Sequence, residues 1–407
     1  MKKTKQYGFL FMCLICCYGN VMAQKVNEFP KKTDPLYKKV EMFDKLMLGN
    51  HWNEGAIMQR VFFPPAGLEK PLIGKQADCF DPTSELLAAY SYKYALTKDP
   101  KDREIANQIF EAVLRMERVT GVDGLFARSF NQTNKPLWHE KVLWYNEWHQ
   151  SSTMPGYRWL GDLSIDKFAS IFDGLGTFWE FCADEAYKKK AADLLDRFMG
   201  RVVDDNFKLT DLDGKMTLWG NLCPDLPHQE LNSLIMLAGL KVTHHLTGKE
   251  KYNKAYHLLI DTYHYDDHQI NTKILFPKEW ENVYDDYHAA RSLYMIMRYE
   301  KDPSLLIKYR MNLNRHWHAW KKMDFSFESS TWLIMVYQVL TGEDCINEER
   351  EKAIKDMWGF DRKTSTFNIP QDDGSFKKVV AEEESSAAAM IRNYWFGVYY
   401  GIIDEKW

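Results

Sequence analysis

Apolar residues recur along this chain mainly with the spacing of helices, and signals for strands are few. The stretch from Phe168 to Cys182 shows this most clearly, because its large apolar residues fall at helical spacing while Ala169, Gly174 and Gly176 keep much of the remaining surface small. A segment of this kind packs against more than one neighbour. The pattern therefore predicts a central, buried helix.

Three carboxylates interrupt this apolar region. Asp162, Asp166 and Asp173 are spaced so that a single helix would carry all of them on one face. An unpaired carboxylate is costly to remove from water. Either these side chains are capped and paired for structural reasons, or their face lines a polar cavity in which they take part in chemistry.

Buried and amphipathic helical segments alternate along the chain. The buried segments begin near Thr83, Ile165, Gln229, Asp286, Ser329 and Ala387, and the amphipathic segments begin near Leu36, Arg103, Glu185, Lys251, Pro303 and Glu348. The pairs recur at intervals of about 50 to 60 residues, which indicates repeated helical hairpins. This order predicts an all-α fold, an (α/α)6 toroid in which the N- and C-terminal helices complete the sixth pair and close the ring.

An open superhelix of hairpins is the alternative architecture. Open arrays usually have polar caps at their ends, whereas the last segment here, from Ala387 to Ile403, is among the most apolar in the chain. No long Pro/Ser linker or block of charge interrupts the repeats. We therefore expect residues 24–407 to form a single toroidal catalytic domain.

The first residues have the features of a secretory signal peptide. Three lysines precede an apolar run from Phe9 to Cys17, and small residues up to Ala23 suit cleavage. The run is shorter than the roughly 20 residues that span a bilayer, and no second long apolar run follows. We expect residues 1–23 to be removed, no transmembrane segment in the mature chain, and export to the periplasm or the medium. A retained anchor and a lipoprotein are the alternatives.

Composition narrows the classes of partner. The formal net charge is −4 and no basic cluster is present, which argues against nucleic acid. Aromatic residues make up 14% of the chain, including 14 Trp and 22 Tyr, and sugar rings stack on exposed aromatic side chains. Large helical cores also contain many Trp and Tyr, so this signal is weak by itself.

No metal or cofactor motif stands out. Outside the signal segment the cysteines are Cys79, Cys182, Cys223 and Cys345, and their spacing contains no CxxC pair. The run from Asp211 to Gly214 resembles part of a calcium loop but lacks the later bidentate Glu, so a turn is the better interpretation. We expect neither a metal nor a cofactor, and we leave open a disulfide between Cys79 and Cys223.

With these patterns in view, the chain resembles the six-hairpin glycosidase superfamily, in particular carbohydrate-active toroids of exported bacterial proteins. The resemblance rests on the number of hairpins, on TGVDGLFAR closing the first hairpin, and on SIDKFASIFDGLGTFWE followed by LTDLDGKMTLWG. It covers nearly the whole mature chain. It implies an oligosaccharide substrate, with anionic sugars included, because the superfamily contains unsaturated glucuronyl hydrolases and related toroids include polysaccharide lyases.

If the ring closes, the inner helices begin at one end of the barrel, where their positive dipole ends suit anionic groups. The polar residues at these starts are Asp81, Ser84 and Glu85; Asp162, Ser164 and Asp166; His228, Gln229 and Glu230; Asp285, Asp286, Tyr287 and His288; Glu328, Ser329 and Ser330; and Glu384 and Ser385. Any single one is an ordinary helix cap. Their occurrence at all six starts points to a shared site.

Glycoside hydrolysis requires two carboxyl groups about 5 to 9.5 Å apart. Asp166, in the first turn of the central helix, is the first choice for one of them. Asp162, Asp286 and Glu328 are the alternatives for its partner. Asp173 lies one or two turns deeper and is interpreted as a paired, structural acid.

A second cluster lies in the segment from Trp138 to Trp159, which is too irregular for one helix and suits a loop over the barrel mouth. Here Trp144, Trp148 and Tyr157 would stack on sugars, and His149 or Arg158 would meet a substrate carboxylate. The alternative is an aromatic loop that simply packs on the toroid. Arg128 and Trp219 are further candidates for substrate binding at the mouth.

Two other functions remain open. A uronate lyase needs a base and an acid beside a neutralised carboxylate, and His149, His288, Tyr287 and Arg158 would suit those roles. A noncatalytic glycan-binding toroid would need none of them. The many carboxylates at the inner helix starts favour a glycoside hydrolase acting on a uronate-containing or related oligosaccharide.

Overall fold

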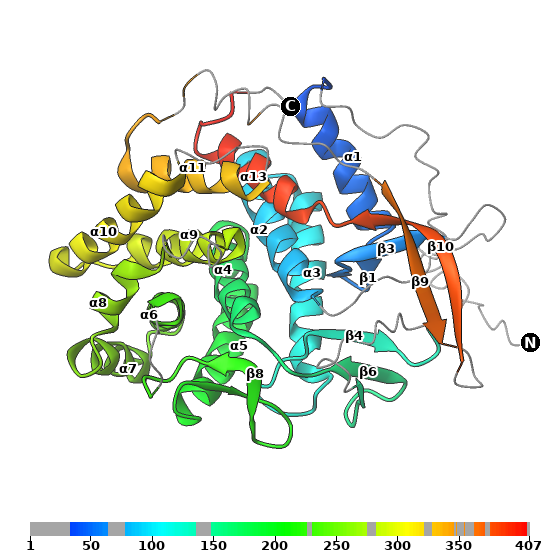
Figure 1. Ribbon diagram of the computed structural model, residues 1–407, viewed down its shortest axis with the longest axis horizontal. Helices are drawn as coiled ribbons and strands as arrows, with labels where there is room; N and C mark the ends of the chain where they lie inside the picture. Colours follow the sequence, from blue (N-terminus) through cyan, green and yellow to red (C-terminus); the bar gives the residue numbers. More distant parts are fainter. Residues whose placement is uncertain are drawn as a thin grey trace, which may run out of the picture.

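The inner helices form a closed ring (Figure 1). The computed structural model describes residues 33–63, 78–135, 148–225, 230–274, 282–320, 328–345, 347, 354, 362–370 and 375–404. The inner helices are α2 (Phe80–Thr97), α4 (Ile165–Phe181), α6 (Glu230–Thr247), α9 (Val283–Tyr299), α11 (Glu328–Thr341) and α13 (Ala388–Tyr399). Each contacts the next in this order, and α13 contacts α2. The predicted toroid is confirmed, and an open superhelix is excluded.

The outer layer consists of amphipathic helices. They are α1 (Leu36–Gly49), α3 (Pro100–Arg118), α5 (Glu185–Asp204), α7 (Glu250–Asp261) and α10 (Pro303–Trp320). Helix α3 packs on α2, α5 on α4 and α6, α7 on α6, α10 on α9 and α11, and α1 on α13. The outer helix predicted to begin near Glu348 falls outside the described residues except for Ile354, which is buried.

Local chemistry sets the boundary between α2 and α3. Helix α2 ends at Lys98, whose backbone is left-handed with a φ of 55°. Asp99 then accepts a hydrogen bond from the Lys101 N–H, and Pro100 occupies the first turn of α3. The helix predicted to begin near Lys251 ends at Asp261. After His264, whose backbone is left-handed with a φ of 54°, the short α8 (Tyr265–His268) and the 3-10 turn η1 (Gln269–Asn271) follow.

The small residues of α4 allow close packing inside the ring. A Cβ added at Gly174 would lie 2.9 Å from the Ser84 Cβ of α2, and one added at Gly176 would lie 2.5 Å from the Met295 Cε of α9. At Gly174 a side chain would displace α2, whereas at Gly176 it would displace the flexible end of Met295. Helix α4 is therefore packed between two other inner helices, as its apolar sequence predicts.

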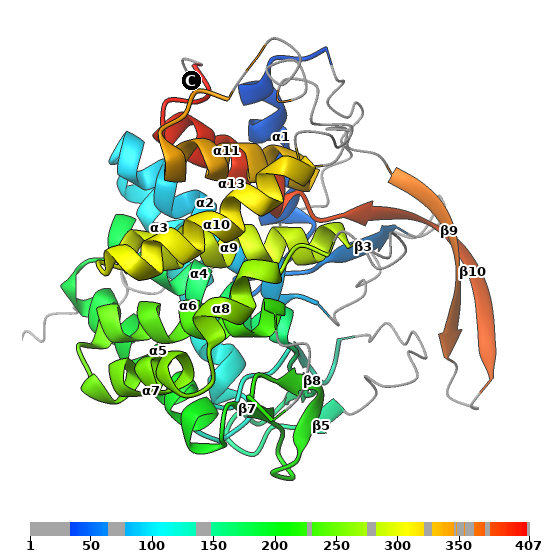
Figure 2. The ribbon, with the colours of Figure 1, turned by 60° about the vertical axis from the view of Figure 1, so that its left-hand side comes forward.

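Small antiparallel sheets join the helices. The strands are β1 (Trp52–Asn53), β2 (Ala56–Ile57), β3 (Arg60–Phe63), β4 (Ser129–Gln132), β5 (Trp148–Gln150), β6 (Tyr157–Leu160), β7 (Lys208–Thr210), β8 (Met216–Asn221), β9 (Arg362–Pro370) and β10 (Phe376–Ser385). Within the described residues the sheets have the orders β1-β2, β3-β10-β9, β4-β6-β5 and β7-β8. Strand β10 pairs with β3 only over Glu382–Ser385, so most of the β9–β10 hairpin extends away from the helices (Figure 2).

The cysteines and the helix lengths bear on two further features of the chain. Cys79 and Cys223 are both buried thiols, and no disulfide joins them. No helix in the described part of the chain has the length and apolar character needed to cross a bilayer. The predicted signal peptide lies outside the described residues, so its cleavage stays a prediction.

Candidate functional site

A buried lysine gathers carboxylates where α2 and α4 begin. The Lys167 Nζ atom lies 2.5 Å from Asp81 Oδ2, 2.5 Å from Asp166 Oδ2 and 3.2 Å from Asp78 Oδ1. The lysine side chain is 3% exposed, and such burial is tolerated only when the ammonium is paired. We call this group, Asp78, Asp81, Asp166 and Lys167, the Lys167 cluster. We use the term mouth for the end of the ring at which the inner helices begin.

Arg128 supports this cluster from below the surface. Its Nη2 donates to Asp78 Oδ1 at 2.7 Å, and its Nη1 donates to the Asp162 carbonyl oxygen at 2.7 Å and to Ser164 Oγ at 3.2 Å. The residue is 1% exposed. The sequence suggested that Arg128 binds substrate, but its guanidinium is buried and braces the loop before α4.

The environment of Asp166 keeps its carboxyl group ionised. Burial would raise the pKa of Asp166, but the Lys167 ammonium beside it outweighs that effect and holds the pKa well below its usual range. The Lys167 backbone N–H donates to Asp166 Oδ1 at 3.0 Å, and the Ser164 hydroxyl donates to the same oxygen. Both oxygens are thus hydrogen-bonded in the charged form.

Helix α9 presents two titratable groups whose charge couples to Asp166. Burial, together with the charges of Asp286 and Asp166, raises the pKa of Asp285, although Asn282 donates to Asp285 Oδ1 at 3.1 Å. Burial and the nearby Arg291 lower the pKa of His288 to about 4, so its imidazole is neutral at pH 7. The His288 Nδ1 atom is buried and has no hydrogen-bond partner among the described residues.

A second buried layer lies beneath the Lys167 cluster. Arg291 places Nε 3.0 Å from Asp173 Oδ2 and Nη2 3.2 Å from Glu85 Oε1. The Tyr287 hydroxyl donates to Glu85 Oε1 at 2.5 Å, and Arg392 lies 3.7 Å from Asp173. Asp173 is therefore the paired, structural acid that the sequence suggested.

Tyr287 belongs to this layer and not to the mouth surface. Its hydroxyl is held by Glu85, and burial raises its pKa. The expectation that Tyr287 binds substrate directly does not fit this position. It lies on the first turns of α9, as predicted, but its side chain faces the interior of the ring.

Asp162 does not share a helix face with Asp166. Helix α4 begins only at Ile165, and Asp162 precedes it in a left-handed conformation with a φ of 58°. Its N–H donates to Asp211 Oδ2 at 2.5 Å, and its Oδ1 accepts from the Leu218 N–H at 2.9 Å. Asp162 therefore ties the β7–β8 hairpin to the start of α4.

Asp286 is not brought to Asp166 by any described contact. Asp286 is 2% exposed, and its carboxylate lies 2.7 Å from the Lys273 Nζ and 3.3 Å from the His316 Nδ1 of α10. It thus faces the outer layer. Glu328 begins α11, as predicted, but its side chain lies outside the described residues.

The β7–β8 hairpin forms part of the rim of the mouth. Its Thr217 hydroxyl donates to the Leu163 carbonyl oxygen at 2.7 Å, which fixes β8 beside the start of α4. Trp219 of β8 is 58% exposed. The indole is therefore an open apolar surface on a strand that is anchored next to the Lys167 cluster.

The aromatic segment predicted to cover the mouth is partly a sheet. The Tyr157 hydroxyl donates to Glu54 Oε2 at 2.9 Å, and the Arg158 guanidinium donates to the Lys135 carbonyl oxygen at 2.6 Å. That guanidinium lies 5.8 Å from the Trp148 ring, and the His149 and Trp159 rings are 4.4 Å apart. Their roles in binding stay predictions. Trp144 lies outside the described residues.

Among the residues that the structure describes, no group of three or more His, Cys, Asp or Glu side chains is arranged to hold an ion. In the run that resembles a calcium loop, Asp211 accepts from Asp162 and Leu212, and Asp213 accepts from Lys215. The run is a turn that connects β7 and β8.

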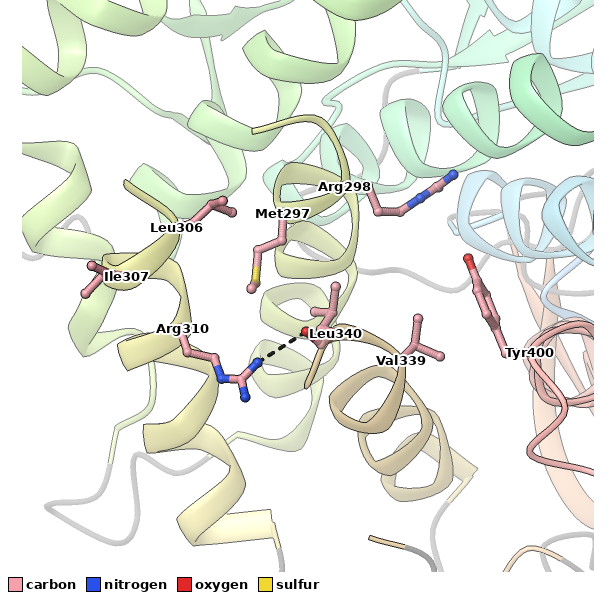
Figure 3. Close-up of a pocket in the computed structure, with 8 residues that line it drawn as sticks. All are labelled: Met297, Arg298, Leu306, Ile307, Arg310, Val339, Leu340 and Tyr400. Carbon is pink, nitrogen blue, oxygen red and sulfur yellow. Dashed lines mark hydrogen bonds between the residues drawn. The ribbon is translucent and has the colours of Figure 1, made fainter. Parts of the chain in front are cut away.

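A pocket of about 590 Å³ lies at the other end of the ring (Figure 3). Its lining is mainly apolar and includes Met297 and Ile307; Arg298 and Arg310 lie at its edge. Both arginines are paired, Arg298 with Glu180 at 2.5 Å and Arg310 with Glu343 at 3.1 Å. Arg298 is 13 positions after Asp285 in α9, which is about 20 Å along the helix. This pocket is separate from the mouth.

Some residues of the site were not selected from the sequence. Lys167 stands in the first turn of an apolar helix, where a cation opposes the helix dipole, and that conflict was a usable signal. Asp285 was indistinguishable from Asp286 because both are acids in the same turn. Asp78 and Arg291 carry no local pattern that marks them.

No protein-family model and no curated protein matches this sequence. Among solved structures, a family 76 α-mannanase from Bacteroides thetaiotaomicron aligns with 91% of this chain and 97% of its own, at 11% identity and a TM-score of 0.51. A family 76 glycoside hydrolase from a bovine strain of that species aligns with 92% of this chain and 79% of its own, at 10% identity and a TM-score of 0.51. A sugar epimerase from a ruminal bacterium aligns with 92% of this chain and 97% of its own, at 13% identity and a TM-score of 0.49. The chain thus shares the (α/α)6 toroid fold with the two family 76 proteins.

Proposed function

We propose that this protein is a carbohydrate-active enzyme, a glycoside hydrolase whose active site is the mouth around the Lys167 cluster. The observation that carries the proposal is the contrast between two carboxyl groups. Lys167 holds Asp166 ionised, whereas burial and neighbouring charge raise the pKa of Asp285. Two titratable groups whose environments drive their pKa values apart are the usual mark of an acid and its charged partner.

In this mechanism Asp285 donates a proton to the glycosidic oxygen as the bond to the leaving sugar breaks. Asp166 stays negative and faces the positive charge that develops at the anomeric carbon. A carboxylate with so low a pKa accepts protons poorly, so Asp166 acts as nucleophile or electrostatic stabiliser and not as general base. Water then adds to the anomeric carbon and gives its proton to the Asp285 carboxylate, which restores the acid. Glu328 remains a further candidate for the proton donor.

The exposed Trp219 would bind a sugar ring at the rim, next to the start of α4. We propose a plant- or host-derived oligosaccharide as substrate, with uronate-containing sugars in the first group to be tested. Because two structural neighbours are family 76 hydrolases, α-mannan belongs in the same panel. The lysines and apolar run before Ala23 support export of the enzyme.

A second candidate is proton abstraction from a carbon of the sugar, ending in elimination or epimerisation. The observation that favours it is His288, a neutral imidazole whose buried Nδ1 has no described partner and which couples to Asp166. Its predicted partner Tyr287 is occupied by Glu85 in the lower layer. Hydrolysis therefore remains the first proposal.

The test is to incubate the purified mature protein with a panel of uronate-containing oligosaccharides and α-mannan. Reducing ends, the ultraviolet absorbance of an unsaturated uronate, and the sugar composition of the products are followed together. Hydrolysis predicts new reducing ends without absorbance. Absorbance that rises with the ends, or an epimer without cleavage, would assign the site to the second candidate.

A matched pair of variants ties any activity to the site. Asp166→Asn is expected to abolish it, whereas Asp193→Asn, which changes an exposed acid of α5 paired with Lys189, is expected to keep it. Glycan binding without turnover in both variants and in the wild type would instead show a noncatalytic glycan-binding toroid.

A further inference from the structure

Ser170 connects the lower buried layer to the Lys167 cluster. It lies on α4 one turn after Asp166, and it is completely buried. Its Oγ accepts a hydrogen bond from the Arg291 Nη1 at 2.5 Å and donates to Asp81 Oδ1. The other Asp81 oxygen accepts from Lys167, which in turn donates to Asp166. A continuous path of hydrogen bonds thus runs from Arg291 to Asp166.

The direction of the serine hydroxyl follows from this arrangement. A hydroxyl has one proton to donate. Because Arg291 supplies its own N–H to the Oγ, the serine proton must go to an acceptor, and Asp81 is nearer than the Asp166 carbonyl oxygen at 3.0 Å. Ser170 therefore satisfies Asp81 on the side away from Lys167.

We propose that Ser170 is a positioning residue for the catalytic carboxylate: by donating to Asp81 it keeps Lys167 shared between Asp81 and Asp166. This inference rests on the proposed role of Asp166. Without the hydroxyl, Asp81 keeps only the more distant Arg291 Nη1, 3.7 Å away, on that side. Its unshared charge then draws Lys167 toward Asp81 and away from Asp166.

The charged groups described around Asp166 affect how Lys167 is shared between Asp81 and Asp166. Asp81 of α2 and Asp78 before it compete for Lys167, and Arg128 offsets Asp78. From α9, Asp285 and His288 couple to Asp166, and Arg291 reaches Asp81. None of these groups changes in a Ser170 variant, so a change in the titration of Asp166 reports the position of Lys167.

The test compares Ser170→Ala with two matched variants. Ser170→Thr keeps the hydroxyl and should behave as the wild type. Ser91→Ala removes a buried serine of another inner helix, α2, whose hydroxyl donates only to the Leu87 carbonyl oxygen of its own turn at 2.7 Å. It controls for the loss of a buried hydroxyl as such.

The measurement is the titration of the Asp166 carboxyl carbon by NMR in aspartate-labelled protein, assigned by its absence in Asp166→Asn. In the wild type, Ser170→Thr and Ser91→Ala, we expect no titration down to the lowest pH at which the fold persists. In Ser170→Ala, we expect the Asp166 carboxyl group to titrate within the pH range in which the fold persists. The apparent pKa on the acid side of the pH profile of any sugar-cleaving activity should rise in parallel.

An unchanged Asp166 titration in folded Ser170→Ala would overturn the inference. If that variant does not fold, Ser170→Cys, which keeps the volume with a weaker donor, is held to the same expectation. The NMR result needs no substrate, so the two proposals fail separately. A shifted midpoint in a protein without glycosidase activity refutes the proposed function alone, and activity with an unshifted midpoint refutes the positioning role alone.

Discussion

Replacing Lys167 by methionine removes the cation that holds the mouth together. The lysine side chain is 3% exposed, and its ammonium is shared by Asp78, Asp81 and Asp166 within 3.2 Å. Removal of one partner from a buried charge pair costs about 3–5 kcal/mol, because the opposite charge is left uncompensated. We expect Lys167→Met to lose about that much unfolding free energy at pH 7.

The loss should depend on pH in a definite direction. In the wild type the pKa values of Asp166 and Asp78 are depressed in the folded state. The two carboxylates therefore stabilise the fold at pH values above the ordinary carboxyl pKa, and this contribution is lost only as the pH falls through their depressed pKa values. In the variant, burial without the ammonium raises those pKa values. The variant therefore gains stability by protonation as the pH falls, and the difference between the two proteins narrows from pH 7 toward pH 4.

Urea unfolding followed by circular dichroism at several pH values measures this difference. Lys189→Met is the control, because Lys189 forms an exposed pair with Asp193 on α5, and such pairs contribute about 0–1 kcal/mol. A loss below about 1 kcal/mol at pH 7 for Lys167→Met, or a loss that does not change with pH, would refute the role assigned to Lys167.

Two further predictions concern the proton donor and the rim. Asp285→Asn should lower kcat about 100-fold or more, as expected for loss of a proton donor. Asp286→Asn changes the adjacent acid, which is bound to Lys273, and should mainly lower stability; equal kcat values of the two variants in steady-state assays would contradict the role of Asp285 as proton donor. Trp219→Ala should raise KM several-fold with little change in kcat. Leu212→Ala, at an exposed apolar position of the same hairpin, should leave KM and kcat unchanged. A wild-type KM in Trp219→Ala would show that the indole does not bind substrate.

The helical ring was predictable because each helix carries its own pattern. The starts predicted at Ile165, Glu185 and Pro303 agree with the structure, since apolar spacing and capping residues are local signals. The β9–β10 hairpin was not predicted, although it includes nine- and ten-residue strands. Its pairing partner β3 lies more than 300 positions away in the chain, so no local pattern reveals where it docks.

The site was predictable only in part. Asp166 was selected because a carboxylate at the start of an apolar helix requires a partner, and the structure supplies Lys167. The spacing of residues did not identify the second carboxylate of the site. Asp162 lies outside α4 because its backbone is left-handed, and Asp286, one position after Asp285, faces α10. Side-chain direction within one helical turn depends on where the helix begins, and α9 begins at Val283, three residues before the predicted start near Asp286.

The most direct test of the account is the glycan assay performed on the wild type and Asp166→Asn side by side, with product chemistry followed in both. The account predicts new reducing ends from at least one oligosaccharide of the panel with the wild type, no unsaturated uronate, and no turnover by Asp166→Asn with its fold intact. Full activity of Asp166→Asn would contradict the placement of the active site at the Lys167 cluster.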